Sequence, residues 1–182
     1  MKVINLGEQN SILNKFVAQM RDKDIQKDSM RFRRNLERLG EIFAYEISKQ
    51  MNASGKDVVT PLGIANMLTY DEHVVVATIL RAGLPLHQGI LNYFDDAQNA
   101  FVAAYRKYDK GEDFHINIEY ATSPSLEGKV LLLADTMLAT GASLEIAYSC
   151  ASTESRHILT SFVLWPAHML WSIYRRPCRP TR

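Results

Sequence analysis

Cysteine is scarce in this chain of 182 residues, and several common signals are missing altogether. Its two cysteines, Cys150 and Cys178, give neither a disulfide framework nor a metal-binding spacing, which fits a reducing compartment. The opening residues, MKVINLGEQNSILNKF, lack an apolar core followed by a small-residue cleavage site, so no signal peptide is predicted and the cytoplasm is the expected location. Neither G-x-x-x-x-G-K-[ST] nor G-x-G-x-x-G occurs, which argues against a P-loop and a dinucleotide fingerprint.

Net charge is nearly absent too, with a formal value of +1 at pH 7. Without a broad basic field, nucleic acid is not an expected partner. The local basic cluster Arg31, Arg33, Arg34 and Arg38 lies largely on the polar side of a predicted helix, where we interpret it as solvated surface. A chain of this length is expected to form one domain that buries about two thirds of its unfolded surface in a single core.

Helical and strand patterns alternate along the chain, which is typical of an α/β protein with a parallel sheet. Apolar spacing predicts a helix behind Ser11, a longer helix over 32–47 capped by Asp28 or Ser29, and a short helix over 86–94. Wholly apolar runs at Val74–Leu80 and Val130–Ala134 predict strands covered on both faces. Further strands are predicted at Phe101–Tyr105 and over 116–120.

The most informative segment is VLLLADTMLATGAS, Val130–Ser143. Asp135 follows a buried strand at its carboxyl end, where open α/β sheets bind their ligands, and a carboxylate there can accept hydrogen bonds from two ribose hydroxyls. Thr140, Gly141, Ala142 and Ser143 precede a helical pattern, so their amides can bind a phosphate at the helix amino terminus. The alternative is an ordinary strand, turn and helix, with Ser143 as N-cap and Asp135 as a solvated turn residue.

Two arginines are further candidate ligands of an anion. Arg81, Ala82 and Gly83 follow the strand Val74–Leu80 and reach the same edge as Asp135, where a guanidinium can bind pyrophosphate oxygens in a bidentate fork. Arg106 is expected to close the strand Phe101–Tyr105 and open a polar loop, Lys107–Asp113. The alternative for Arg81 is a surface arginine on a turn.

These segments, in this order, resemble type I phosphoribosyltransferases. ADTMLATGAS is similar to the loop that binds phosphoribosyl pyrophosphate (PRPP), and its MLATG core resembles uracil phosphoribosyltransferases. ATILRAGLPLHQGI and AYRKYDKGEDF match two further segments of the family, and FAYEISKQ and VVTPLGIA also resemble it. The resemblance runs from about residue 10 to about residue 150.

The resemblance implies a central parallel sheet with helices on both faces and a hood of short strands that folds over PRPP. It also implies the reaction of uracil with PRPP to give UMP and pyrophosphate, with Mg²⁺ held by PRPP oxygens and water rather than by protein ligands. Asp135 and Arg106 are the expected catalytic residues. PRPP is expected to contact Arg81, Ala82, Gly83, Arg106, Asp135, Thr136, Met137, Leu138, Ala139, Thr140, Gly141, Ala142 and Ser143. A homo-oligomer is expected, and GTP is a further candidate ligand, as in some relatives.

Composition changes abruptly after residue 150. All nine glycines and all nine lysines precede Ala151, whereas the last residues hold both tryptophans and three of the six prolines. We therefore divide the chain into a PRPP-binding domain, 1–150, and an atypical hydrophobic and basic tail, 151–182. The tail lacks the Gly-Asp-Ala loop with which uracil phosphoribosyltransferases recognise the base, so the fold is expected to be incomplete there and activity impaired.

The tail has three interpretations. It is an out-of-frame or otherwise replaced segment; or Ile158–Tyr174, which lacks Asp, Glu, Lys and Arg, is a short membrane anchor; or His157–Trp165 is a core strand ended by Pro166. No membrane association is expected, since Pro166, His168 and several hydroxyls weaken the anchor. Two functional alternatives to the enzyme also stand: a catalytically defective relative that still binds PRPP or phosphate, and a regulatory protein on the same fold.

Overall fold

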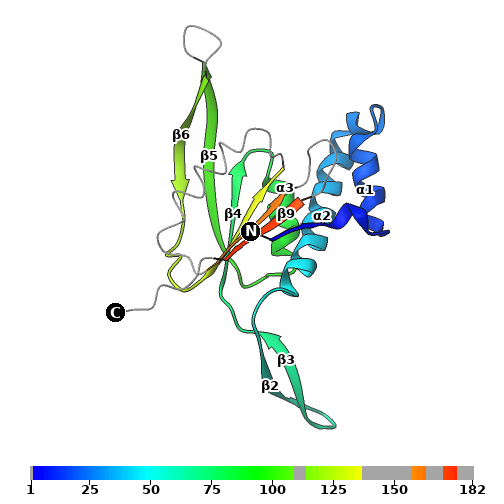
Figure 1. Cartoon of the computed structure of the whole chain (residues 1–182), viewed down its shortest axis with the longest axis vertical. Helices are drawn as coiled ribbons and strands as arrows, with labels where there is room; N and C mark the ends of the chain where they lie inside the picture. Colours follow the sequence, from blue (N-terminus) through cyan, green and yellow to red (C-terminus); the bar gives the residue numbers. More distant parts are fainter. Residues whose placement is uncertain (1, 109–113, 137–156, 163–169, 176–182) are drawn as a thin grey trace.

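The computed structural model (Figure 1) describes residues 2–108, 114–136, 157–162 and 170–175. Within them, a seven-stranded mixed sheet has the order β1-β9-β8-β7-β4-β5-β6. The four central strands β8, β7, β4 and β5 run parallel, which confirms the predicted parallel sheet, while β6, β9 and β1 each run antiparallel to their neighbour. The strands are β1 (Lys2–Asn5), β4 (Val74–Leu80), β5 (Gln98–Tyr108), β6 (Phe114–Thr122), β7 (Val130–Asp135), β8 (His157–Phe162) and β9 (Leu170–Arg175).

Three helices lie where the apolar spacing predicts them: α1 (Ile12–Arg21), α2 (Ser29–Ser48) and α3 (Leu84–Leu91). Single 3₁₀ turns occur at Leu6–Glu8 and Ile25–Lys27. Of the two predicted caps for α2, Asp28 is the one used, because its Oδ1 accepts hydrogen bonds from the backbone N–H groups of Met30 (3.1 Å) and Arg31 (3.0 Å). This carboxylate satisfies two of the donors that a helix start leaves free.

The main core lies between the helices and one face of the sheet. It includes Leu39, Phe43 and Ile47 of α2, packed with β4 and β7 side chains of the same face. Two glycines let α2 and α3 approach closely: a Cβ on Gly40 would overlap the Leu86 carbonyl oxygen, and one on Gly89 would overlap that of Glu37. Helix α3 is thereby fixed against both α2 and the sheet.

The opposite face of the central strands is also apolar. Val75 and Ala77 of β4 and Leu131 and Leu133 of β7 form a second buried cluster with Leu126. Both strands are therefore covered on both faces, as their uninterrupted apolar sequences predict. The helix predicted beyond Ser143 lies outside the described residues.

A two-stranded hairpin, β2 (Ala53–Thr60) and β3 (Gly63–Tyr70), projects from the body (Figure 1). It was not among the predicted elements, although Pro61 and a glycine two residues later give a recognisable turn signal. Gly63 has φ +132°, a conformation that favours glycine. Thr60 closes the turn, since its hydroxyl donates to the Gly63 carbonyl at 2.7 Å.

The tail contributes backbone to the sheet. β8 pairs in parallel with β7, from His157 opposite Val130 to Phe162 opposite Asp135, and β9 pairs with the N-terminal strand β1. A strand in the sheet is what the third interpretation of the tail predicts, and β8 covers His157–Phe162 of the predicted His157–Trp165. The remaining three residues, 163–165, lie outside the described residues. Among the described residues, no helix is long and apolar enough to cross a membrane. Whether 151–182 is a unit distinct from 1–150 stays a prediction.

Candidate functional site

Three neighbouring strands bring the predicted ligands to one edge of the sheet. In the order β7-β4-β5, Thr78 lies opposite Ala134 and Leu80 lies opposite Ala103. Because these strands are parallel, Asp135 and Arg81 meet at the carboxyl edge, with about 5 Å between neighbouring strands. β5 passes this edge near Ala103 and continues beyond it to Tyr108. The structure therefore brings together the backbone positions that the sequence marked as a site.

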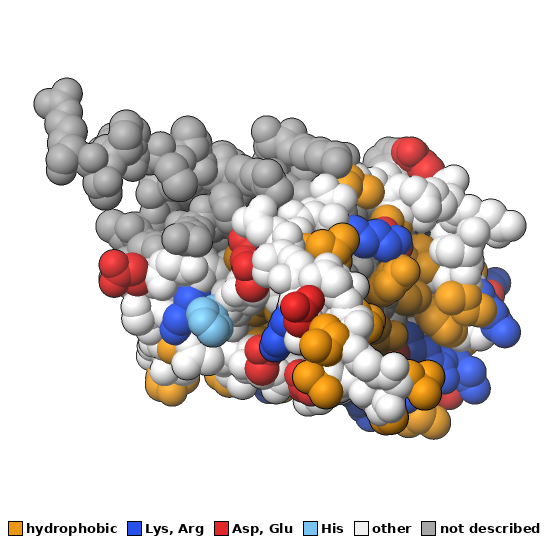
Figure 2. Space-filling view, turned by 90° about the horizontal axis from the view of Figure 1, so that it is seen from below, with side chains coloured by type: hydrophobic (Ala, Val, Ile, Leu, Met, Phe, Trp, Pro, Cys, Tyr) orange, Lys and Arg blue, Asp and Glu red, His pale blue; other side chains and the backbone are white. Residues whose placement is uncertain are grey.

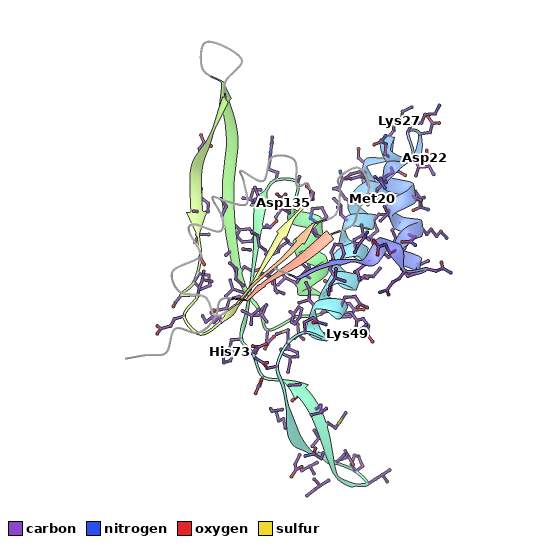
Figure 3. All side chains as sticks on the ribbon, in the orientation of Figure 1. Met20, Asp22, Lys27, Lys49, His73 and Asp135 are labelled. Carbon is purple, nitrogen blue, oxygen red and sulfur yellow. The ribbon has the colours of Figure 1, made fainter. Side chains whose placement is uncertain are left out.

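Asp135 is the last residue of β7, and Figure 3 shows it at the tip of that strand. Its side chain is largely buried, and Oδ1 accepts a hydrogen bond from the Thr136 N–H at 2.7 Å. Thr136 is buried as well. A carboxylate fixed in this way, and not solvated as in the turn interpretation, can accept hydrogen bonds from a ligand with little loss of conformational entropy.

The loop after β4 exposes Arg81 and Ala82 and buries Gly83. The peptide bond between Leu80 and Arg81 is cis. The loop turns back on its own strand, because the Gly83 N–H donates to the Ile79 carbonyl at 3.3 Å and the Leu84 N–H donates to that of Arg81 at 3.3 Å. Arg81 is thus an exposed cation on an anchored loop, as a pyrophosphate ligand should be.

Gly83 has no room for a side chain. An added Cβ would overlap Thr78 Oγ1 and come within 2.9 Å of the Ile79 carbonyl oxygen. Thr78 is itself fully buried, and its hydroxyl donates to the Ala134 carbonyl at 2.9 Å. From the sequence, Gly83 is expected to admit an anion close to the backbone; the structure shows that the glycine is also required for close packing on β4.

The position of Arg106 corrects one prediction. The strand was predicted to end at Tyr105 and a loop to begin at Lys107, whereas β5 continues to Tyr108 and Arg106 pairs with Ile116 of β6. The antiparallel partner extends the ladder, because backbone hydrogen bonds to β6 hold polar residues in a strand as readily as apolar ones. The segment expected to form the hood is therefore a long antiparallel pair of strands, β5 and β6, with Arg106 in β5.

His87, a buried histidine on α3 whose backbone N–H donates to the Gly83 carbonyl at 2.9 Å, was not among the predicted site residues. Its Nε2 lies 2.7 Å from Asn99 Oδ1, and its ring packs on Phe101 with centroids 5.1 Å apart. Burial lowers the pKa of His87 below its ordinary value, against a smaller opposing effect of the Asn99 hydrogen bond. Within the described residues its Nδ1 has no hydrogen-bond partner. The only signal in the sequence was a histidine one position after the apolar Leu86.

Seven predicted PRPP contacts lie outside the described residues: Met137, Leu138, Ala139, Thr140, Gly141, Ala142 and Ser143. The phosphate cradle therefore stays a prediction. Among the described residues, no group of three or more His, Cys, Asp or Glu side chains could hold a metal ion. The carboxylate of Asp135 at the edge nevertheless fits Mg²⁺ bound mainly through substrate phosphates, since this ion is usually held by one or two carboxylates with phosphate oxygens and water.

Comparison with known structures defines the class of fold. The chain matches the structure of the AQ2163 protein from Aquifex aeolicus with a TM-score of 0.77 and 27% identity, covering 87% of this chain and 74% of that one. It matches a hypoxanthine phosphoribosyltransferase from Staphylococcus aureus with a TM-score of 0.51 at 14% identity, over 70% of this chain and 61% of that one. The fold is that of a type I phosphoribosyltransferase.

Sequence comparison is more specific. The sequence model of the family "Uracil phosphoribosyltransferase" matches residues 8–155. A uracil phosphoribosyltransferase from Porphyromonas gingivalis is 55% identical over 160 residues, which cover 87% of this chain and 74% of the relative. The chain belongs to the uracil phosphoribosyltransferase family, as the resemblance of its motifs implied.

Proposed function

We propose that this protein's reaction is the transfer of a phosphoribosyl group from PRPP to uracil, giving UMP and pyrophosphate, as in pyrimidine salvage. Membership of the family supports the reaction, and the geometry of the carboxyl edge supports the PRPP half of the site. The observation that carries the proposal is the convergence of a fixed, buried carboxylate, Asp135, and an anchored, exposed guanidinium, Arg81, on neighbouring parallel strands.

Positioning and electrostatics carry the catalysis in this proposal, and no protein nucleophile is needed. Asp135 accepts hydrogen bonds from the ribose hydroxyls and favours the positive charge that develops on the ribosyl ring. Arg81 binds the pyrophosphate, whose negative charge grows as the bond to the ribose breaks. Arg106 closes the hood and excludes water. The amides of Thr140–Ser143 hold the 5′-phosphate.

Mg²⁺, when bound to PRPP, neutralises the pyrophosphate and improves it as a leaving group. Asp135, at the carboxyl edge, would contact that ion directly or through water. Cytoplasmic location belongs to the proposal too and rests on the cysteine content of the chain. GTP as an additional ligand stays a prediction.

Activity is proposed to be impaired, because the tail lacks a Gly-Asp-Ala loop to orient uracil. A base that is not held by fixed donors and acceptors loses both affinity and the entropic advantage of alignment. The missing loop favours the second candidate function, a relative that binds PRPP but transfers it poorly. The match of the family model ends at residue 155, two residues before β8 begins, which supports a replaced tail.

A homo-oligomer is proposed on the evidence of the hairpin. Figure 2 views the molecule from the end at which β2–β3 projects and shows hydrophobic side chains on that surface. Five aliphatic side chains of the hairpin are more than half exposed: Val59, Leu62, Ile64, Met67 and Leu68. A bare two-stranded hairpin is marginally stable in water. Val59, Ile64 and Leu68 lie on one face of the hairpin, because Val59 pairs with Ile64 and side chains alternate along a strand, and Leu62 lies in the turn beside them. A two-fold dimer through that face would bury these four side chains twice, at about 1.5–3 kcal/mol each. The total, about 12–24 kcal/mol, compares with an association cost of about 4–15 kcal/mol.

Sedimentation of two matched variants tests the oligomer. The pair Leu62→Ser and Ile64→Thr should give a monomer. Met30→Ser, at an apolar site on α2 that is also more than half exposed, should leave the dimer intact. A parent chain that is monomeric at tens of micromolar would show the proposal to be wrong.

The PRPP site is tested by thermal melting. PRPP with Mg²⁺ should raise the Tm of the parent chain, because a ligand that binds only the folded state stabilises it by mass action. Asp135→Asn keeps the shape of the side chain and an oxygen for the Thr136 N–H, so the fold should survive while most of the shift is lost. No shift in the parent at millimolar PRPP would refute the proposal.

A further inference from the structure

Thr78 occupies a position that the proposed chemistry does not use. It lies near the end of β4, fully buried, on the face of the sheet that carries Val76 and Ala134. A buried hydroxyl on that apolar face needs a hydrogen-bond partner, and the partner of Thr78 lies on the neighbouring strand β7. Its Oγ1 donates to the Ala134 carbonyl at 2.9 Å, and Ala134 is the residue immediately before Asp135.

The same oxygen supports the Arg81 loop. Gly83 packs so closely on Thr78 Oγ1 that a Cβ at position 83 would overlap it, and that Cβ would lie only 3.3 Å from the Ala134 carbonyl oxygen. Thr78, Gly83 and Ala134 therefore form one close-packed contact. On one side of it is the loop that carries Arg81, and on the other is the strand end that carries Asp135.

We propose that Thr78 is a positioning residue: its hydroxyl fixes the spacing between the pyrophosphate ligand Arg81 and the ribose ligand Asp135. This inference rests on the proposed function. PRPP spans both groups, so its binding depends on their separation, whereas a fragment that uses one group does not. A small displacement between groups that must act together on one ligand has a large effect on its binding.

This dependence gives Thr78 a signature that loss of stability alone would not produce. Replacing the hydroxyl by a methyl group in Thr78→Val removes the hydrogen bond and places a larger group against Gly83. PRPP affinity should then fall by roughly tenfold or more, while ribose 5-phosphate and pyrophosphate, measured separately, should each bind within about twofold of the parent. Thr78→Ser keeps the hydroxyl and should bind PRPP like the parent.

The experiment is calorimetric titration of Mg²⁺–PRPP, ribose 5-phosphate and Mg²⁺–pyrophosphate into the full-length parent, Thr78→Val, Thr78→Ser and Val76→Ala. Val76 is buried on the same strand and face, two residues farther from the ligand edge, so its variant controls for loss of packing. If Thr78→Val does not fold, Thr78→Ala replaces it, because the smaller side chain cannot press on Gly83.

Selective loss of PRPP binding in Thr78→Val, rescued in Thr78→Ser and absent from Val76→Ala, is the expected result. Equal PRPP affinity in parent and Thr78→Val, or a parallel loss of all three ligands, overturns the positioning role while leaving the proposed function standing. A parent that binds none of the three ligands overturns the proposed function and the positioning role together.

Discussion

The neighbouring strands β7 and β8 belong to one sheet but differ in the side chains at their carboxyl ends. β7 has the sequence VLLLAD and ends at Asp135, the carboxylate of the site; β8 has the sequence HILTSF and ends at Phe162, opposite Asp135. Either sequence can form a strand of the sheet, because pairing requires only backbone hydrogen bonds and enough apolar residues. Binding at the carboxyl edge needs particular side chains, and the tail sequence after Phe162 supplies no carboxylate.

This difference indicates that pairing in a sheet demands less of a sequence than binding a ligand at the edge of that sheet. Residues of β4 and β7 place a carboxylate and a guanidinium on a close-packed, hydrogen-bonded frame. The tail extends that frame, because β8 pairs with β9 and β9 pairs with β1, so the sheet continues beyond the proposed PRPP site. The half that would orient uracil is the part that a strand alone does not provide.

The largest expected effect is the gain of activity when the tail is replaced. A chimera that carries residues 1–150 of this chain and the C-terminal region of an intact relative should form UMP at least about a hundredfold faster than this chain, because the base becomes aligned with the ribose. Formation of UMP from labelled uracil and PRPP measures the difference. The same chimera with Asp135→Asn should lose the gain, and equal rates in parent and chimera would show that the tail builds its own uracil pocket.

A smaller effect is expected on ligand affinity when Arg81 and Arg106 are replaced separately. Arg81→Ala should weaken PRPP and pyrophosphate alike, by about tenfold to a hundredfold, since each loses a charged bidentate partner. Arg106→Ala should weaken PRPP and largely spare pyrophosphate, because its proposed role is closure of the hood. Arg33→Ala, an exposed arginine on α2, is the control. A double mutant of Arg81 and Arg106 with the parent's affinity for PRPP would contradict both roles.

The smallest effect concerns His87, in the contact between α3 and β5. Burial lowers the pKa of His87 in the folded chain below its ordinary value of 6.5. At a pH between the folded pKa and 6.5, His87 is therefore protonated in the unfolded chain and neutral in the folded chain. The free energy of unfolding should therefore decrease as pH falls below 6.5, until the folded pKa is reached. Urea titrations from pH 7.5 to 5 should show this loss in the parent and a weaker loss in His87→Gln. Identical pH dependence in both would exclude His87 as its source.

Much of this fold could be predicted because several helices and strands have long, regular patterns of apolar residues. The twenty residues of α2 carry an apolar stripe and an Asp28 cap, and β4 and β7 are uninterrupted apolar runs. The β2–β3 hairpin was missed because its apolar residues are exposed, so alternation between core and solvent does not mark them. The end of β5 was placed too early because pairing with β6, and not hydropathy, keeps Arg106 in a strand.

The candidate site shows the same division. The positions of Asp135 and Arg81 at the carboxyl edge could be predicted because each directly follows an apolar run, and strand ends of parallel sheets converge. Thr78 and His87 could not, since their roles depend on contacts with Gly83, Ala134 and Asn99 that only the packed structure brings together. Local sequence marks the residues at strand ends more readily than the buried residues that support them.

The central claim, an intact PRPP half and a missing uracil half, is tested most directly by comparing two ligands that differ only in the base. Calorimetry of UMP and ribose 5-phosphate with this chain measures what the base adds to binding. Without a base site the two dissociation constants should agree within about threefold, while both ligands still bind, because the phosphate and ribose contacts are shared. UMP that binds about a hundredfold or more tighter than ribose 5-phosphate would reveal a functional uracil site and contradict the claim.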